Sequence, residues 1–112
     1  MIVLPFSSRV LGALASEQLR KGRVSQTLRS KTEVMKLALG ETEVILDGDL
    51  LYRGNISEIT GPFVLSSMNV NDAALGGFQS LLDLTMALKR AGFRFKSFSE
   101  YNVFKVSFKE LF

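Results

Sequence analysis

The sequence predicts one α+β domain over residues 1–112, with an N-terminal helix, an antiparallel β-meander, one long helix packed on the sheet and a C-terminal β-hairpin. Two observations favour this fold class. Short segments of alternating apolar and polar residues, separated by turn residues, fill the middle of the chain, as is typical of antiparallel strands. A longer stretch with apolar residues at helical spacing follows them. A length of 112 residues fits one such domain.

The first segment, Ile2 to Phe6, is β-prone and predicts a short strand. A serine at 7 or 8 can then cap a helix, because its hydroxyl accepts a hydrogen bond from a free backbone amide. We expect this helix to run to about Lys21, although Gly12 weakens it. The polar, basic stretch from Arg23 to Lys31 is expected to be a loop or an extended arm.

The meander is predicted from turn residues between alternating segments. Asp47-Gly48 is a strong signal for a two-residue hairpin, and Gly54-Asn55 predicts a further turn. The expected strands are Thr32–Leu39, Thr42–Leu46, Asp49–Arg53 and Ile56–Ser66.

The predicted hairpin is apolar on both faces. A two-residue loop pairs Leu46 with Asp49, Ile45 with Leu50 and Val44 with Leu51. Neither face of this pair is an obvious water face. Either helices cover one side and something else covers the other, or the strand pair contributes to an interface.

The long helix is expected to begin near the capping side chains of Asn69 to Asp72, or only after Gly76-Gly77, and to end at about Ala91. Its apolar stripe is wider than a surface helix needs. After Gly92, the segments Phe93–Phe98 and Val103–Phe108 predict the terminal hairpin. The stripe is formed by Phe78, Leu81, Leu82, Leu84, Met86 and Leu88.

The composition argues against an enzyme. There is no cysteine, which excludes disulfides, thiolate metal sites and a cysteine nucleophile, and no histidine, the usual general base and commonest metal ligand. Phosphate-cradling, dinucleotide-binding and serine-nucleophile motifs are missing. The one carboxylate cluster, between Glu41 and Asp49, is interpreted as a solvated hairpin rim rather than a catalytic or cation site. We therefore expect no catalysis, no metal, no cofactor and no small-molecule substrate.

Charge is distributed in three blocks. Residues 1–36 carry seven basic side chains against two acidic ones, residues 37–88 one against seven, and residues 89–112 six against two. Such asymmetry favours nucleic acid, an acidic protein surface or head-to-tail self-association. The alternative is that the blocks neutralise one another in the folded chain. No apolar stretch is long enough to cross a membrane, and no convincing targeting segment is present, so we expect a cytoplasmic protein.

The leading functional hypothesis is a small non-enzymatic interaction module, either a homo-oligomer or a regulator that docks on a larger protein. It depends on the apparent surplus of apolar surface in the hairpin and the long helix. The candidate interface residues are Ile45, Leu50, Tyr52, Leu84 and Leu88.

The alternative hypothesis is a nucleic-acid-binding protein that uses the basic N-terminal arm and the C-terminal hairpin. Phenylalanines alternate with cations on both predicted hairpin strands, and cations on a sheet can neutralise phosphates. Lysines that guard an edge strand against aggregation would give the same pattern. The candidate residues are Arg20, Lys21, Arg23, Arg29, Lys31, Lys89, Arg90, Arg94, Lys96, Lys105 and Lys109.

Overall fold

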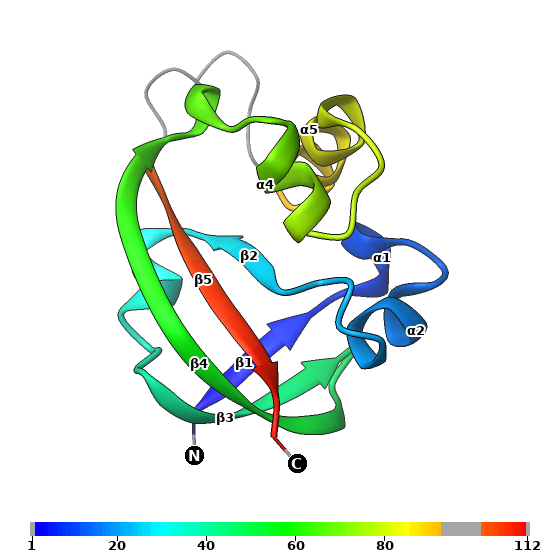
Figure 1. Ribbon diagram of the computed structural model, residues 1–112, viewed down its shortest axis with the longest axis vertical. Coiled ribbons are helices and arrows are strands. Elements are labelled where there is room, and N and C mark those ends of the chain that lie inside the picture. Colours follow the sequence, from blue (N-terminus) through cyan, green and yellow to red (C-terminus); the bar gives the residue numbers. More distant parts are fainter. Residues whose placement is uncertain (1, 93–101, 112) are drawn as a thin grey trace.

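The computed structural model describes residues 2–92 and 102–111, and within them five strands form one mixed sheet in the order β1-β3-β4-β5-β2 (Figure 1). The α+β class is therefore confirmed. The strands are β1 (Val3–Phe6), β2 (Gln26–Arg29), β3 (Gly40–Leu46), β4 (Asp49–Val64) and β5 (Asn102–Glu110). The helices are α1 (Ser8–Leu11), α2 (Ala15–Arg20), α3 (Lys31–Val34), α4 (Val70–Leu75) and α5 (Leu81–Arg90), with a 3-10 turn at Leu65–Ser67.

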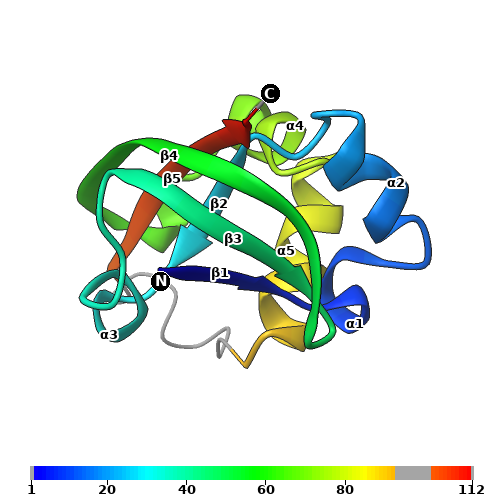
Figure 2. The same ribbon diagram turned by 90° about the horizontal axis from the view of Figure 1, so that it is seen from below.

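The sheet is curled into a half-barrel. Strand β1 pairs with β3 in parallel, and the other neighbours are antiparallel. Figure 2 shows α1, α2 and α5 gathered on one side of the curl and α3 on the other. The curl lets the two edge strands be bridged by one side chain, because Arg29 on β2 donates a hydrogen bond from Nη2 to the carbonyl of Pro5 on β1.

Two apolar cores lie on opposite faces of β5. Val106 and Phe108 belong to a core that includes residues of β1, β3, β4 and α2. Val103, an odd number of positions away on the same strand, packs instead with Leu84 and Leu88 of α5. Side chains alternate along a strand, so β5 contributes to both cores and is buried on both sides.

The expected N-terminal helix is wrong as a continuous element. It is interrupted at Gly12, whose φ of 104° lies in a region that side-chain-bearing residues rarely adopt. Two short helices, α1 and α2, stand in its place. The capping role of Ser7 is confirmed, because its side chain accepts a hydrogen bond from the amide of Arg9.

Of the loop or extended arm expected over Arg23 to Lys31, the extended form is confirmed in part, whereas the strand expected over Thr32–Leu39 is wrong. Four residues of the first stretch form β2, which pairs antiparallel with β5. Lys31 then starts α3, because Ser30 and Glu33 form a capping box in which each side chain accepts a hydrogen bond from the other's backbone amide. This local pairing stabilises the start of a helix at a position where the alternating pattern predicted a strand.

The hairpin at Asp47-Gly48 is confirmed, but only part of its predicted strand pairing is correct. Ile45 lies opposite Leu50 as expected, but Val44 lies opposite Tyr52, because a bulge shifts the register there. The turn expected at Gly54-Asn55 is wrong, since β4 continues through it to Val64. Glycine is needed at 54 for close packing, since a Cβ there would lie 2.9 Å from the carbonyl oxygen of Lys109.

The expected long helix is wrong as well. Residues 70–90 form α4 and α5, separated by Gly76 and Gly77 and restarted by Ser80, whose side chain caps α5. The segment Val103–Phe108 is confirmed as a strand, and it forms part of β5. Strand β5 pairs with β4 along one edge and with β2 along the other. The other predicted hairpin strand, Phe93–Phe98, lies outside the described residues. Over residues 2–92 and 102–111, no helix has the length and apolar character needed to cross a bilayer.

Candidate functional site

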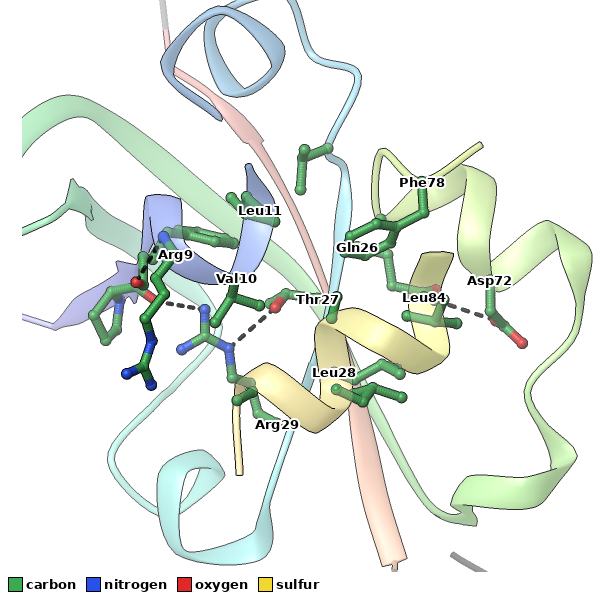
Figure 3. Close-up of a pocket in the computed structure, with 18 of the residues that line it drawn as sticks. Arg9, Val10, Leu11, Gln26, Thr27, Leu28, Arg29, Asp72, Phe78 and Leu84 are labelled. Carbon is green, nitrogen blue, oxygen red and sulfur yellow. Dashed lines mark hydrogen bonds between the residues drawn. The ribbon is translucent and has the colours of Figure 1, made fainter. Parts of the chain in front are cut away.

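A cavity of about 370 Å³ opens beside β2 (Figure 3). Helix α5 crosses the strand there, and α1 closes the opposite side. Leu11 of α1 and Leu84 and Leu88 of α5 give the cavity an apolar wall, which Phe78 extends from the loop before α5. An apolar hollow with a few fixed polar groups is the usual form of a ligand site.

The cavity follows the edge of β2 rather than one of its faces. Gln26 and Leu28 point toward α4 and α5, and Thr27 and Arg29 point to the other face, because side chains alternate along a strand. All four residues nevertheless line the cavity. This arrangement is possible because β2 is the last strand of the sheet and has a neighbour on one side only.

Arg29 is buried at one end of the cavity. Its Nε donates to the Thr27 hydroxyl at 3.1 Å, and its Nη1 lies 3.3 Å from a carboxylate oxygen of Glu33. The guanidinium also lies 4.9 Å from the centre of the Phe6 ring, in addition to its bond to Pro5. Burial lowers the pKa of Arg29, and the Glu33 carboxylate opposes that effect. This predicted nucleic-acid-binding residue is thus occupied in joining the two edge strands.

A second polar cluster lies at the other end. The buried carboxylate of Asp72 accepts from Gln26 Nε2 at 3.2 Å, from Lys105 Nζ at 2.9 Å and from the amide of Asn69 at 3.0 Å. Burial raises the pKa of Asp72, but these hydrogen bonds outweigh it and hold the pKa below its ordinary value. Lys105 also lies over the Phe63 ring. It is therefore paired within the chain.

Arg9 lines the cavity, and its backbone and side chain are bonded to Arg90. Arg90, at the end of α5, donates to the carbonyls of Arg9 and Val10, and Arg9 donates back to the carbonyl of Arg90 at 3.2 Å. These bonds tie α1 to α5, while the Arg9 side chain stays exposed. Arg9 was not among the predicted site residues, because a lone cation inside an expected helix gave no cluster. Lys89, beside Arg90, is exposed on the same turn of α5.

Three other predicted cations line a second hollow of about 260 Å³ between α2 and β5. There Lys21 forms an ion pair with Glu17, and Arg20 donates to the carbonyl of Leu51 at 3.3 Å. Lys109 lies on the same rim. The eleven predicted cations therefore do not form one surface. Arg23 lies between α2 and β2, Lys31 begins α3, and Arg94 and Lys96 lie outside the described residues.

The predicted interface residues are also divided. Tyr52, Leu84 and Leu88 are buried in the chain's own cores. Ile45 is partly buried, and Leu50 is 55% exposed. Burial, with a further contribution from the charge of Glu110, raises the pKa of the Tyr52 hydroxyl to about 12.

The carboxylates of the β3–β4 hairpin show no metal site. Asp47 accepts from both the amide and the hydroxyl of Ser8, and these bonds lower its pKa. Within the described part of the chain, no three side chains of His, Cys, Asp or Glu gather as metal ligands.

Comparison with known proteins identifies the fold. No protein-family model and no curated protein sequence matches the chain. The solved structure of the ASCH domain from Lactobacillus crispatus JV V101 is similar, with a TM-score of 0.67 and 12% sequence identity. The match covers 87% of this chain and 70% of that one. The chain therefore has a fold similar to that of this ASCH domain.

Proposed function

We propose that this chain binds single-stranded RNA and takes one unstacked base into the cavity beside β2. The fold supports this hypothesis, because the ASCH domain is a PUA-like domain implicated in RNA binding. The observation that carries the proposal is the cavity itself, which combines an apolar wall, fixed polar groups and an exposed arginine at the mouth. Sequence-specific RNA recognition commonly targets splayed, unstacked bases of single strands.

The roles of the cavity residues follow from their positions. The Phe78 ring and the leucines of α5 offer apolar surface to the flat faces of a base. Arg9 is exposed beside the opening, where it can pair with a phosphate of the same nucleotide. The nucleic-acid hypothesis drawn from the sequence also depended on cations that pair with phosphates. The phosphate contact proposed here is made by Arg9, which was not among the cations predicted from the sequence.

We propose binding without catalysis. The charged groups that line the cavity are Arg9, Arg29, Glu33 and Asp72, and each has a hydrogen-bond or ion-pair partner within the chain. General acid–base work needs a side chain that can exchange a proton near neutral pH. The lowered pKa of Asp72 keeps its carboxylate charged there, and an arginine guanidinium does not exchange its proton near neutral pH. The interaction-module hypothesis has less support, since most of its interface residues are buried.

The test is the affinity for a labelled single-stranded RNA, measured by fluorescence anisotropy over a series of salt concentrations. Each phosphate contact on a single strand contributes about 0.7 to the slope of log affinity against log salt. We expect Arg9→Gln to reduce that slope by about 0.7. The matched control is Lys109→Gln, which removes one exposed cation from the second hollow and should leave the slope unchanged. Absence of RNA binding at low salt, or an equal change in both variants, would contradict the proposal.

A further inference from the structure

The free edge of β2 offers main-chain groups to the cavity. In an antiparallel pair, residues alternate between those that bond the partner strand and those that point away from it. The amide of Phe108 donates to the carbonyl of Ser25 at 3.1 Å, which sets the phase of this alternation. Thr27 and Arg29 therefore bond β5. The N–H and C=O groups of Gln26 and Leu28 point to the opposite side, where the cavity lies.

These groups have no partner among the described residues. No hydrogen bond from residues 2–92 or 102–111 reaches the main chain of Gln26 or Leu28 on that side. Unpaired main-chain groups at a sheet edge are ready to pair with whatever molecule reaches them. The cavity residues that flank them are mostly apolar, so a ligand that pairs there is shielded from water.

The open part of the edge is short. At one end, the bond from Arg29 to Pro5 crosses from β2 to β1. At the other end the regular strand stops at Gln26, because Ser25 lies outside β2 and its amide donates to the carbonyl of Leu75 at 2.9 Å. Only the segment from Gln26 to Leu28 stays open. That length suits a single heterocycle better than an added peptide strand, which needs several residues in register.

The chemistry of the edge also suits a nucleobase. The N–H and C=O of one outward-pointing residue form a donor beside an acceptor. Every nucleobase presents a complementary pair on its edge, a ring or exocyclic acceptor next to a donor. The main chain of Gln26 and Leu28 can therefore pair with a base that enters the cavity edge-on, but it cannot by itself distinguish one base from another.

The Gln26 side chain supplies the missing discrimination. A carboxylate only accepts hydrogen bonds, so Asp72 fixes the amide with its nitrogen toward Asp72. Its Oε1 is then the other end of the amide, and it receives no hydrogen bond from a described residue. Every fully buried polar side-chain atom of the described residues has a partner, so this oxygen is not fully buried, and Gln26 lines the cavity. Lys105 and the Asn69 amide hold Asp72 in turn. Gln26 Oε1 is thus an acceptor of fixed orientation on a residue that lines the cavity, and a ligand with a hydrogen-bond donor can pair with it.

We propose that the Gln26–Leu28 segment pairs with the edge of the bound base, and that Gln26 selects bases with an exocyclic amino group over uracil. Adenine, cytosine and guanine carry such an amino group, whose second hydrogen can reach Oε1, and uracil carries only carbonyl oxygens. This inference rests on the proposed RNA binding. It goes further because it assigns the selecting residue and the class of base.

The test compares labelled hexamers of adenosine, cytidine and uridine by fluorescence anisotropy at one low salt concentration. We expect the adenosine and cytidine hexamers to bind about tenfold more tightly than the uridine hexamer. Gln26→Leu should weaken adenosine and cytidine binding to the uridine level. The matched control is Gln79→Leu, the same substitution at an exposed position outside the cavity, which should keep the preference.

A second probe leaves the protein unchanged. A hexamer of N6,N6-dimethyladenosine has lost both amino hydrogens, and we expect the wild-type chain to bind it no better than the uridine hexamer. Equal binding of all hexamers would overturn the inference while leaving RNA binding intact. A preference that survives Gln26→Leu or dimethylation would also overturn it. Failure of every hexamer to bind would instead overturn the proposed function on which the inference depends.

Discussion

The cavity beside β2 and the hollow between α2 and β5 both have cations on their rims but differ in what lies inside. The cavity beside β2 has an apolar wall, an open strand edge and an amide fixed by Asp72. The hollow between α2 and β5 gathers more of the predicted cations, but Lys21 is neutralised by Glu17 and Arg20 is bonded to a carbonyl. The comparison shows that cation density alone does not locate a site, because a base needs flat apolar surface and unpaired hydrogen-bonding groups.

The two hollows should also differ in how much their cations stabilise the fold. Replacing Arg29 with methionine keeps the apolar stem but leaves the Pro5 carbonyl without its donor and ends the link between β1 and β2. Hydrogen bonds to charged groups contribute about 1.5–3 kcal/mol each, so we expect a loss of about 3 kcal/mol in the free energy of unfolding. Urea denaturation followed by circular dichroism measures this.

The matched variant in the second hollow is Lys21→Met. Its ion pair with Glu17 is exposed on both sides, and such pairs contribute less than about 1 kcal/mol. Equal destabilisation by the two variants would show that Arg29 does not bridge the edge strands as described.

A smaller effect is expected at Asp72, and it depends on pH. The pKa of this carboxyl is lowered in the folded chain, so its ionised form stabilises the fold. That contribution is fully present above the unfolded pKa of about 3.9 and is lost as the pH falls through the lower folded pKa. We expect Asp72→Asn to lose about 2 kcal/mol at neutral pH and to approach the wild-type stability in acid.

Thermal or urea unfolding from pH 2 to pH 7 checks this prediction. Glu17→Gln, which removes the carboxylate of the second hollow's ion pair, is the control and should run parallel to the wild type within about 0.5 kcal/mol. A constant gap between Asp72→Asn and the wild type at all pH values would contradict the assigned ionisation.

Local signals in the sequence predicted part of this structure. Asp47-Gly48 gave the hairpin, and the caps at Ser7 and Asn69 gave two helix starts, because the side chain and the backbone it bonds lie within a few residues. The alternation of apolar and polar residues in Val103–Phe108 predicted a strand, but it did not predict that this strand has a neighbouring strand on each side. The number of partners of a strand depends on segments far along the chain.

The candidate site was largely hidden from sequence analysis for the same reason. Gln26 and Asp72 are 46 positions apart, and Arg29 meets Pro5 across 24. Nothing near Gln26 in the sequence indicates that its amide is fixed by a distant carboxylate. Gln26 and Arg29 lie on the short strand β2, within a stretch whose basic residues led us to predict a loop or an extended arm. The strand pattern of these four residues is too short to predict a strand within the basic stretch.

The most direct test of the account follows backbone amide resonances while an adenosine hexamer is added to isotope-labelled protein. We predict that the largest shift changes fall on the amides of Gln26 and Leu28, with smaller changes at Arg9 and Phe78. Those two strand amides should also exchange with solvent more slowly in the complex. Changes centred instead on Lys21, Tyr52 and Lys109, with the β2 amides unmoved, would contradict the assignment of the site to the free edge of β2.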